Sequence, residues 1–227
     1  MPESAFSRGE IWAIVVAGGD GRRFGSQKQF LDLMGINVLE RSVSLARAVA
    51  DHVVAVVPHS AVNDKNRHGG ADIVVAGGID RSASVREGLA VVADSALVII
   101  VHDAARPLAS PELFSQVVAS LGEGVDGVVP GIAVVDTVKR VSEGFVLETL
   151  DRNSLIAVQT PQAFRADVLR AAHASGASAT DDAALVEVNG GVIAVVEGDV
   201  RNIKLTEPSD VDIALSYILE SPQEDAL

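Results

Sequence analysis

Short apolar runs alternate with segments of helical periodicity along the first part of the chain. Four runs are almost continuously apolar and predict strands: 11–17, 52–58, 72–78 and 96–103. Three segments repeat apolar residues at helical spacing and predict helices: 38–50, 84–93 and 110–122. Strands that alternate with helices, and that are apolar on both faces, are typical of crossover units around a mostly parallel sheet. The pattern therefore predicts an α/β fold whose sheet is covered by helices on both faces.

The alternation breaks at residues 134–150. This stretch has two short strand patterns around a Ser-Glu-Gly turn and no helix between them, which predicts a β-hairpin inserted into the α/β domain. An isolated hairpin is only marginally stable in water, so we expect it to pack on a second subunit; the alternative is that it folds back on its own domain. A strand at 191–198 and a closing helix from about Pro208 complete the pattern. No linker or repeat is visible, so we expect residues 1–227 to form one domain.

Composition narrows the classes of function. The chain has 227 residues, 48% of them hydrophobic, and no cysteine, which excludes disulfides, thiolate metal sites and a cysteine nucleophile and fits a cytoplasmic setting. Residues 11–17 are too few to span a bilayer, and no signal peptide pattern precedes them, so we expect no membrane partner. The formal net charge of −13 argues against a nucleic-acid surface. An anionic ligand would need a local basic pocket.

The most informative loop follows the first predicted strand. Residues 15–30 read VVAGGDGRRFGSQKQF, and glycines at the carboxyl end of a strand expose backbone N–H groups to an anion. A dinucleotide fingerprint is excluded because its last glycine would be Phe24, and a P-loop because no lysine follows Gly25 directly. The remaining pattern, A-G-G-x-G-x-R-x-G-x-x-K-Q, predicts a phosphate-binding loop. A glycine-rich turn with solvated arginines is the alternative.

Seven further motifs follow this loop in order: GGIDRSASV, VHDAARPL, VDTVKRV, LDRN, TPQAF, TDDAAL and RNIKLTEPSD. Together they cover nearly the whole chain, and the ordered set resembles the 2-C-methyl-D-erythritol 4-phosphate cytidylyltransferases of the non-mevalonate isoprenoid pathway. The resemblance implies a Rossmann-like nucleotidyltransferase fold of the glycosyltransferase-A type, with three layers and a protruding hairpin arm that makes a homodimer. It also implies transfer of a cytidylyl group from CTP to a sugar-alcohol phosphate, release of pyrophosphate, and Mg²⁺ or another divalent cation as cofactor.

The same resemblance assigns roles to individual residues. The implied catalytic cations are Arg23, Lys28 and Lys204. The implied nucleotide-binding residues are Ala17, Gly18, Gly19, Gly21, Lys28, Gly78, Ser84 and Asp103. The implied acceptor-binding residues are Asp103, Ala104, Arg106, Thr137, Arg152, Thr160 and Lys204, with Thr137 and Arg152 reaching across from the arm of the other subunit. Asp103 is also the implied metal ligand, because Mg²⁺ often takes one or two carboxylates plus phosphates.

Several of these residues also have purely structural explanations. Ser84 is placed to be the N-cap of the helix that follows it, and Asp103 to brace a loop. A surface ion pair with Asp151 or Glu148 would explain Arg152. We expect His102 to be a packed strand residue, since an ionised phosphate needs no general base.

The TDDAAL motif is explained as a helix start. Thr180 would be the N-cap, with Asp181 and Asp182 in the first turn, so we assign it no catalytic role.

Two departures from the family pattern leave the acceptor open. The loop reads Ala17-Gly18-Gly19 where many members have A-A-G, and Gln27 stands where they usually have proline. The first departure is similar to the related ribitol-5-phosphate cytidylyltransferases, which are therefore the alternative. A non-catalytic nucleotide-binding module is the remaining alternative from another class.

Overall fold

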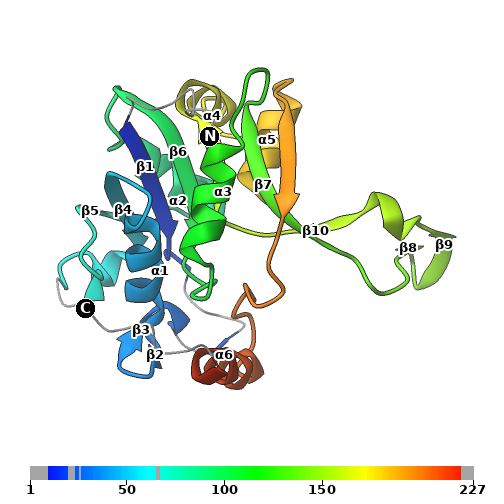
Figure 1. Cartoon of the computed structure of the whole chain (residues 1–227), viewed down its shortest axis with the longest axis horizontal. Helices are drawn as coiled ribbons and strands as arrows, with labels where there is room; N and C mark the ends of the chain where they lie inside the picture. The colour runs from blue at the N-terminus through cyan, green and yellow to red at the C-terminus, as the bar shows by residue number, and fades with distance from the viewer. Residues whose placement is uncertain (1–9, 20–23, 26, 65–66, 221–227) are drawn as a thin grey trace.

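The computed structural model describes residues 10–19, 24–25, 27–64 and 67–220, and its centre is an eight-stranded sheet (Figure 1). The sheet strands are β1 (Glu10–Val16), β4 (His52–Val57), β5 (Ile73–Ala76), β6 (Ala96–Asp103), β7 (Gly127–Ala133), β10 (Ile156–Val158), β11 (Gln162–Arg165) and β12 (Ile193–Glu197). Their order is β10-β7-β11-β6-β1-β4-β5, and β12 pairs with β7 off this path. The pairs of β1 with β4 and β6, of β4 with β5 and of β7 with β12 are parallel, which confirms the predicted mostly parallel sheet.

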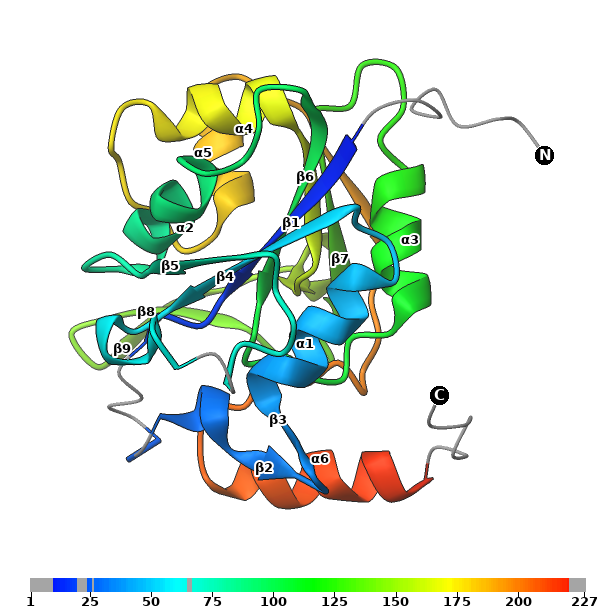
Figure 2. The same cartoon turned by 90° about the vertical axis from the view of Figure 1, so that its left-hand side faces the viewer.

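Two helical layers cover the two faces of the sheet (Figure 2). One layer holds α1 (Val38–Arg47) and α3 (Pro111–Ala119), and the other holds α2 (Arg81–Leu89), α4 (Ala166–His173) and α5 (Asp182–Val188). Strand β1 shows why both faces are covered. Its side chains alternate, so that Ala13 and Val15 join the core on the α1 face while Trp12 and Ile14 join the core on the α2 face. The three-layer α/β architecture is therefore confirmed.

A smaller lobe lies below the sheet in the view of Figure 1. It contains the 3-10 helix η1 (Lys28–Phe30), the short strands β2 (Asp32–Leu33) and β3 (Ile36–Asn37), and the closing helix α6 (Ser209–Glu220). Leu33, Leu205 and Ala214 are fully buried together in this lobe, so the segment that follows the glycine-rich loop and the C-terminal segment share one small core. Another 3-10 helix, η2 (His59–Ala61), follows β4. No helix in the described part of the chain is both long and apolar enough to cross a membrane.

Two of the helix starts correct predictions made from the sequence. At a third, Ser110 caps α3 by accepting a hydrogen bond from the Leu113 N–H. Helix α2 begins earlier than predicted, because Asp80, not Ser84, accepts from the N–H three residues on. Helix α5 is capped by Asp181, not by Thr180 as predicted, through the Ala184 N–H. At both of these helix starts the N-cap is an aspartate carboxylate and not the nearby serine or threonine hydroxyl.

The predicted hairpin at 134–150 stands away from the body of the molecule (Figure 1). Strands β8 (Lys139–Ser142) and β9 (Phe145–Thr149) pair only with each other among the described residues, and all their residues are exposed. Glu143 and Gly144 form the turn with φ of 50° and 83°, a geometry that suits a two-residue hairpin loop. The 3-10 helix η4 (Arg152–Ser154) follows β9. The alternative in which the hairpin folds back on its own domain is therefore wrong.

One glycine sets the distance between α2 and the sheet. A Cβ added to Gly88 would lie 2.6 Å from Ile14 Cγ2 and 3.2 Å from Val56 Cγ2, both fully buried. Gly88→Ala is therefore expected to lower the free energy of unfolding by about 1–2 kcal/mol, because overpacking outweighs the gain in helix propensity. Urea denaturation measures this. Gly122→Ala is the matched control, since a Cβ there meets nothing within 4 Å, and equal effects at both glycines would contradict the prediction.

Candidate active site

A pocket of about 620 Å³ opens at the carboxyl ends of β1 and β6. The two strands pair in parallel with Val16 opposite Asp103, so the loops that follow them leave the sheet at the same edge. The predicted site residues that line the pocket are Ala17, Gly18, Gly19, Lys28, Gly78, Ser84, Asp103, Ala104 and Lys204. Four sequence motifs that lie far apart in the chain therefore meet in one cavity.

One wall of the pocket is built without large side chains. The Ser84 hydroxyl accepts a hydrogen bond from the Gly78 N–H (3.1 Å) and donates one to the Asp80 carbonyl (2.8 Å), which ties the loop after β5 to α2. A Cβ on Gly18 would lie 3.1 Å from Ser84 Oγ and 3.2 Å from Gly77 Cα. The departure at Gly18 thus concerns the packing of the wall predicted to bind the nucleotide.

Two lysines approach the pocket from the smaller lobe. Lys28, in η1, donates a hydrogen bond to the Leu205 carbonyl, which ties the glycine-rich loop to the segment that carries Lys204. Gln29 is buried and donates to the Gly19 carbonyl at 3.1 Å, which fixes the other side of the loop. The Lys28 side chain is consequently held by a contact between segments that lie 177 residues apart.

Asp103 lies between two cations. Its Oδ1 accepts from Arg81 Nε at 2.9 Å and its Oδ2 from Lys204 Nζ at 2.6 Å. Burial raises the pKa of Asp103, but Arg81 and Lys204 outweigh it and hold that pKa well below its ordinary value. Burial lowers the pKa of Arg81, but the two carboxylates near it, Asp103 and Asp182, raise it above the ordinary value. At neutral pH the Asp103 carboxylate is therefore an anion that orders cations, not a proton donor.

The sequence prediction missed Arg81 and Asp182. Arg81 opens α2 and lines the pocket, and its Nη1 donates to Asp182 Oδ2 at 2.7 Å. Asp182 is fully buried and also lies 2.9 Å from His173 Nε2. Arg81 lies three positions after Gly78 in the GGIDRSASV motif, which was the one signal for it. Asp182 gave none beyond its place in a helix start.

Four predicted acceptor residues lie outside the pocket lining: Arg106, Thr137, Arg152 and Thr160. Arg106 donates to the carbonyls of Asn202 (2.7 Å) and Val158 (3.4 Å), so it braces the loop that it belongs to. The buried Thr160 hydroxyl accepts a hydrogen bond from the Asp103 N–H at 3.0 Å and therefore holds the backbone of Asp103. Arg152 donates to the Val135 carbonyl. Whether any of them contacts the acceptor stays a prediction.

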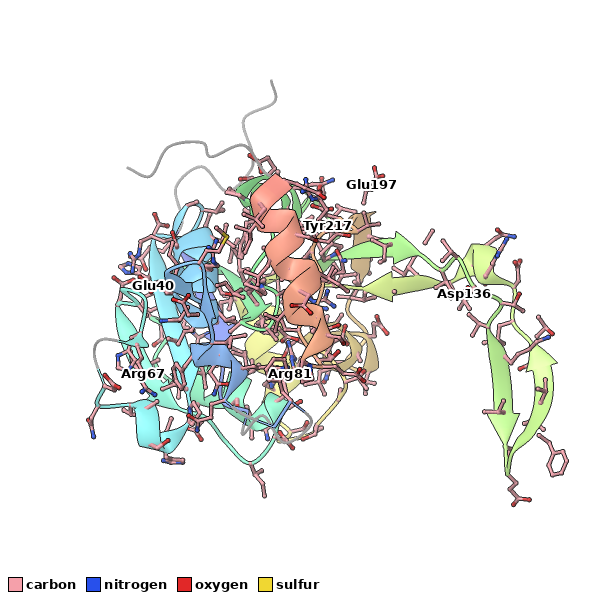
Figure 3. All side chains as sticks on the ribbon, turned by 90° about the horizontal axis from the view of Figure 1, so that it is seen from below. Glu40, Arg67, Arg81, Asp136, Glu197 and Tyr217 are labelled. Atoms are coloured by element: carbon pink, nitrogen blue, oxygen red, sulfur yellow. The ribbon has the colours of Figure 1, made fainter. Side chains whose placement is uncertain are left out.

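The arm carries its predicted residues away from the pocket of the same chain. Figure 3 shows Asp136, the neighbour of Thr137, on the arm and Arg81 in the body of the molecule, far apart. The ion-pair explanation of Arg152 finds no support in the described chain, because Glu148 pairs with Arg140 at 2.9 Å. Thr137 and Arg152 are thus presented outward.

His102 is confirmed as a packed residue. Its ring is fully buried, lies 3.2 Å from the Thr160 hydroxyl and packs on Phe114. Burial lowers its pKa to about 4, so the ring is neutral at pH 7.

Two predicted residues, Gly21 and Arg23, lie outside the described residues. Within the described part of the chain, no group of three or more His, Asp or Glu side chains could hold a metal ion.

Comparisons with known proteins agree with this geometry. The family model of 2-C-methyl-D-erythritol 4-phosphate cytidylyltransferase matches residues 11–220. The enzyme of that name from Rhodococcus opacus is 43% identical over 223 residues, which is 95% of this chain and 98% of that protein. The one from Carboxydothermus hydrogenoformans is 40% identical over 220 residues, covering 90% and 94% of the two chains.

Solved structures of proteins with this activity in their names are also similar to this chain. The 4-diphosphocytidyl-2C-methyl-D-erythritol synthase of Anaerococcus prevotii matches with a TM-score of 0.81 and 28% identity, over 93% of this chain and 99% of that one. The 2-C-methyl-D-erythritol 4-phosphate cytidylyltransferase of Thermus thermophilus matches with a TM-score of 0.77 and 30% identity, over 91% and 98%. This chain belongs to the family of 2-C-methyl-D-erythritol 4-phosphate cytidylyltransferases, nucleotidyltransferase enzymes of isoprenoid biosynthesis.

Proposed function

We propose that this enzyme transfers a cytidylyl group from CTP to 2-C-methyl-D-erythritol 4-phosphate. The products are 4-diphosphocytidyl-2-C-methyl-D-erythritol and pyrophosphate. The observation that carries the proposal is the pocket at the carboxyl edge of the sheet, which is lined by a glycine-rich wall, by Lys28, and by Asp103 held between Lys204 and Arg81. Membership of the family supports the identity of both substrates.

Cytidylyl transfer depends on stabilisation of negative charge more than on proton transfer. An oxygen of the acceptor phosphate attacks the α-phosphorus of CTP, the bond to the bridging oxygen breaks, and pyrophosphate leaves in line. The attacking phosphate is already ionised, so no side chain has to remove a proton. Lys28 and Lys204, together with Arg23, would stabilise the charge on the α-phosphate and on the departing pyrophosphate.

Small residues would hold the nucleotide. The backbone N–H groups of Ala17, Gly18 and Gly19 would contact the triphosphate, because loops of this kind present several donors to an anion. Gly78 and Ser84 would contact the cytosine base. The Ser84 hydroxyl already donates to Asp80, so it would receive a hydrogen bond from the base and not give one.

A divalent cation, Mg²⁺ in the first instance, belongs to the proposal. Asp103 would hold it with one oxygen, since a carboxylate retains lone pairs after each oxygen has accepted one hydrogen bond, and phosphate oxygens would complete the coordination. When bound, the ion would neutralise negative charge on the phosphates. The chain's own contribution is to fix Asp103 between Arg81 and Lys204.

A homodimer through the arm is also part of the proposal. Val141, Phe145 and Leu147 on the hairpin are 63%, 75% and 61% exposed, which is a large apolar surface for a free hairpin. Residues 134–150 of one subunit would cross to the other and bring Thr137 and Arg152 to its acceptor phosphate. Arg152 suits this role because its planar guanidinium binds phosphate with two hydrogen bonds. We also propose a cytoplasmic location.

A comparison of acceptors tests the function directly. The purified protein with CTP and Mg²⁺ is expected to release pyrophosphate with 2-C-methyl-D-erythritol 4-phosphate, and at least about tenfold more slowly with ribitol 5-phosphate, because an acceptor that misaligns the attacking oxygen loses rate. A coupled pyrophosphate assay at saturating CTP measures both. Faster release with ribitol 5-phosphate would replace the proposed acceptor by the alternative one. Binding of CTP without turnover on either acceptor would overturn cytidylyl transfer to both.

A further inference from the structure

A chain of charged and polar side chains runs from the buried core to the pocket. It begins at His173 in α4, passes through Asp182 and Arg81, and ends at Asp103 and Lys204 in the pocket. The exposed fractions of these side chains are 2%, 0%, 22%, 11% and 39% in that order. Every link is a hydrogen bond of 2.6–2.9 Å that joins two different elements of the fold. The series connects α4 and α5 on one face of the sheet with the catalytic edge.

Arg81 is the central residue of this series, because its orientation affects the position of Asp103. Its Nε is held by Asp103 and its Nη1 by Asp182, while its Nη2 is buried with no hydrogen-bond partner among the described residues. A planar guanidinium held at two nitrogens cannot rotate about its own bonds. With one of the two carboxylates removed, only a single hydrogen bond would orient the fork. Without Asp182, the guanidinium would be held only by Asp103 itself, so Arg81 would no longer fix the position of Asp103 from a second anchor.

Asp182 has no contact with the pocket, which makes its full burial informative. A buried ion pair contributes little net stability, and hydrophobic residues of similar volume often serve as well or better. The start of α5 does not require this carboxylate, because Asp181 caps the helix. The contact that only Asp182 makes is the bridge from His173 to Arg81.

We infer that Asp182 is a positioning residue for cytidylyl transfer. It fixes the guanidinium of Arg81, Arg81 fixes the carboxylate of Asp103, and Asp103 in turn sets the place of the Lys204 ammonium. This inference rests on the proposed function, since it assigns Asp103 and Lys204 to the reacting phosphates. The TDDAAL motif therefore has a role beyond starting a helix.

Steady-state kinetics of Asp182→Asn test the inference. Asparagine keeps the shape and removes the charge that holds Arg81, so kcat is expected to fall about 10–100-fold, while KM for CTP changes less than about threefold because the glycine wall is untouched. His173→Leu is the matched control: it removes the other partner of the same buried carboxylate and leaves Arg81 in place. Its kcat is expected to stay within about threefold of the wild type, although its unfolding temperature falls.

A double variant separates positioning from a merely structural role. If Asp182 acts through Arg81, then Arg81→Ala combined with Asp182→Asn has the kcat of Arg81→Ala alone. The double variant is also expected to unfold at a higher temperature than Arg81→Ala, since that single variant leaves a buried carboxylate without its cation.

Three kinetic results would overturn the inference. They are wild-type kcat in Asp182→Asn, losses of kcat that multiply in the double variant, or an equal loss of kcat in His173→Leu. Each is distinct from failure of the proposed function, in which the wild-type protein itself releases no pyrophosphate. A crystal structure of Asp182→Asn that still has the Arg81 Nε to Asp103 Oδ1 bond at 2.9 Å would likewise contradict it.

Discussion

Lys204→Ala is expected to lower kcat for pyrophosphate release by about 10²–10⁵-fold, the range found for cations that stabilise phosphoryl-transfer transition states. The ammonium of Lys204 lies 2.6 Å from Asp103 Oδ2 at the edge of the pocket, 39% exposed, so one face of it is free to meet a phosphate. Its loss removes a positive charge from the place where negative charge develops. Initial rates at saturating CTP and acceptor measure the effect.

Two further variants make the result specific. Lys204→Arg is expected to recover only a small part of the rate, because a planar guanidinium cannot present the same compact charge beside Asp103. The chain has only four lysines against fourteen arginines, so this lysine stands where arginine is the usual cation of the sequence. Arg47→Ala removes the same charge on α1, where Arg47 pairs with Asp72, and should leave kcat within about twofold. Lys204→Ala with more than a tenth of wild-type kcat would remove Lys204 from the catalytic residues.

The sheet was largely predictable because its strands are buried on both faces. Runs such as 96–101 are apolar without interruption, and a parallel strand between two helical layers favours that pattern. Parallel strands then bring their carboxyl ends to one edge. This is why the glycine-rich loop after Val16 and the residues around Asp103 were expected together, and they do line one pocket.

The antiparallel part of the sheet follows from the arm. Strand β11 runs antiparallel to both β6 and β7, and β10 runs antiparallel to β7. The chain leaves β7, forms the hairpin and returns through 156–165 without a crossover helix, so the returning strands must be antiparallel. The sequence shows the missing helix but not where the returning strands insert in the sheet.

The residues that the sequence could not reveal act over long distances. Arg81 and Asp182 are 101 positions apart, and an aspartate in the first turn of a helix has an ordinary explanation. Ser84 was the predicted N-cap of α2, but Asp80 caps the helix, and the Ser84 hydroxyl instead joins the Gly78 N–H to the Asp80 carbonyl. A local pattern does not show which of these partners a serine will take.

The second large effect concerns the arm: two inactive variants are expected to restore activity when they form a heterodimer. Lys28→Ala and Arg152→Ala are each expected to be inactive as homodimers, one through its pocket and the other through its arm. When the two variants carry different tags and are produced together, the purified heterodimer is expected to have about half of the wild-type activity per dimer. Its Arg152→Ala subunit keeps an intact Lys28 pocket, and the arm that reaches this pocket comes from the other subunit with an intact Arg152.

The reciprocal heterodimer excludes a trivial explanation. A wild-type subunit paired with a subunit that carries both Lys28→Ala and Arg152→Ala contains the same four side chains at the same positions, distributed differently. If Arg152 acts across the interface, the wild-type pocket receives an altered arm and the altered pocket lacks its lysine, so this dimer is expected to be inactive. If Arg152 acts within its own subunit, the opposite result is expected. The heterodimer of the two single variants is then inactive, and the heterodimer of the wild type with the double variant has about half of the wild-type activity per dimer. The outward position of the arm, with its strands exposed and remote from Arg81, favours the first result.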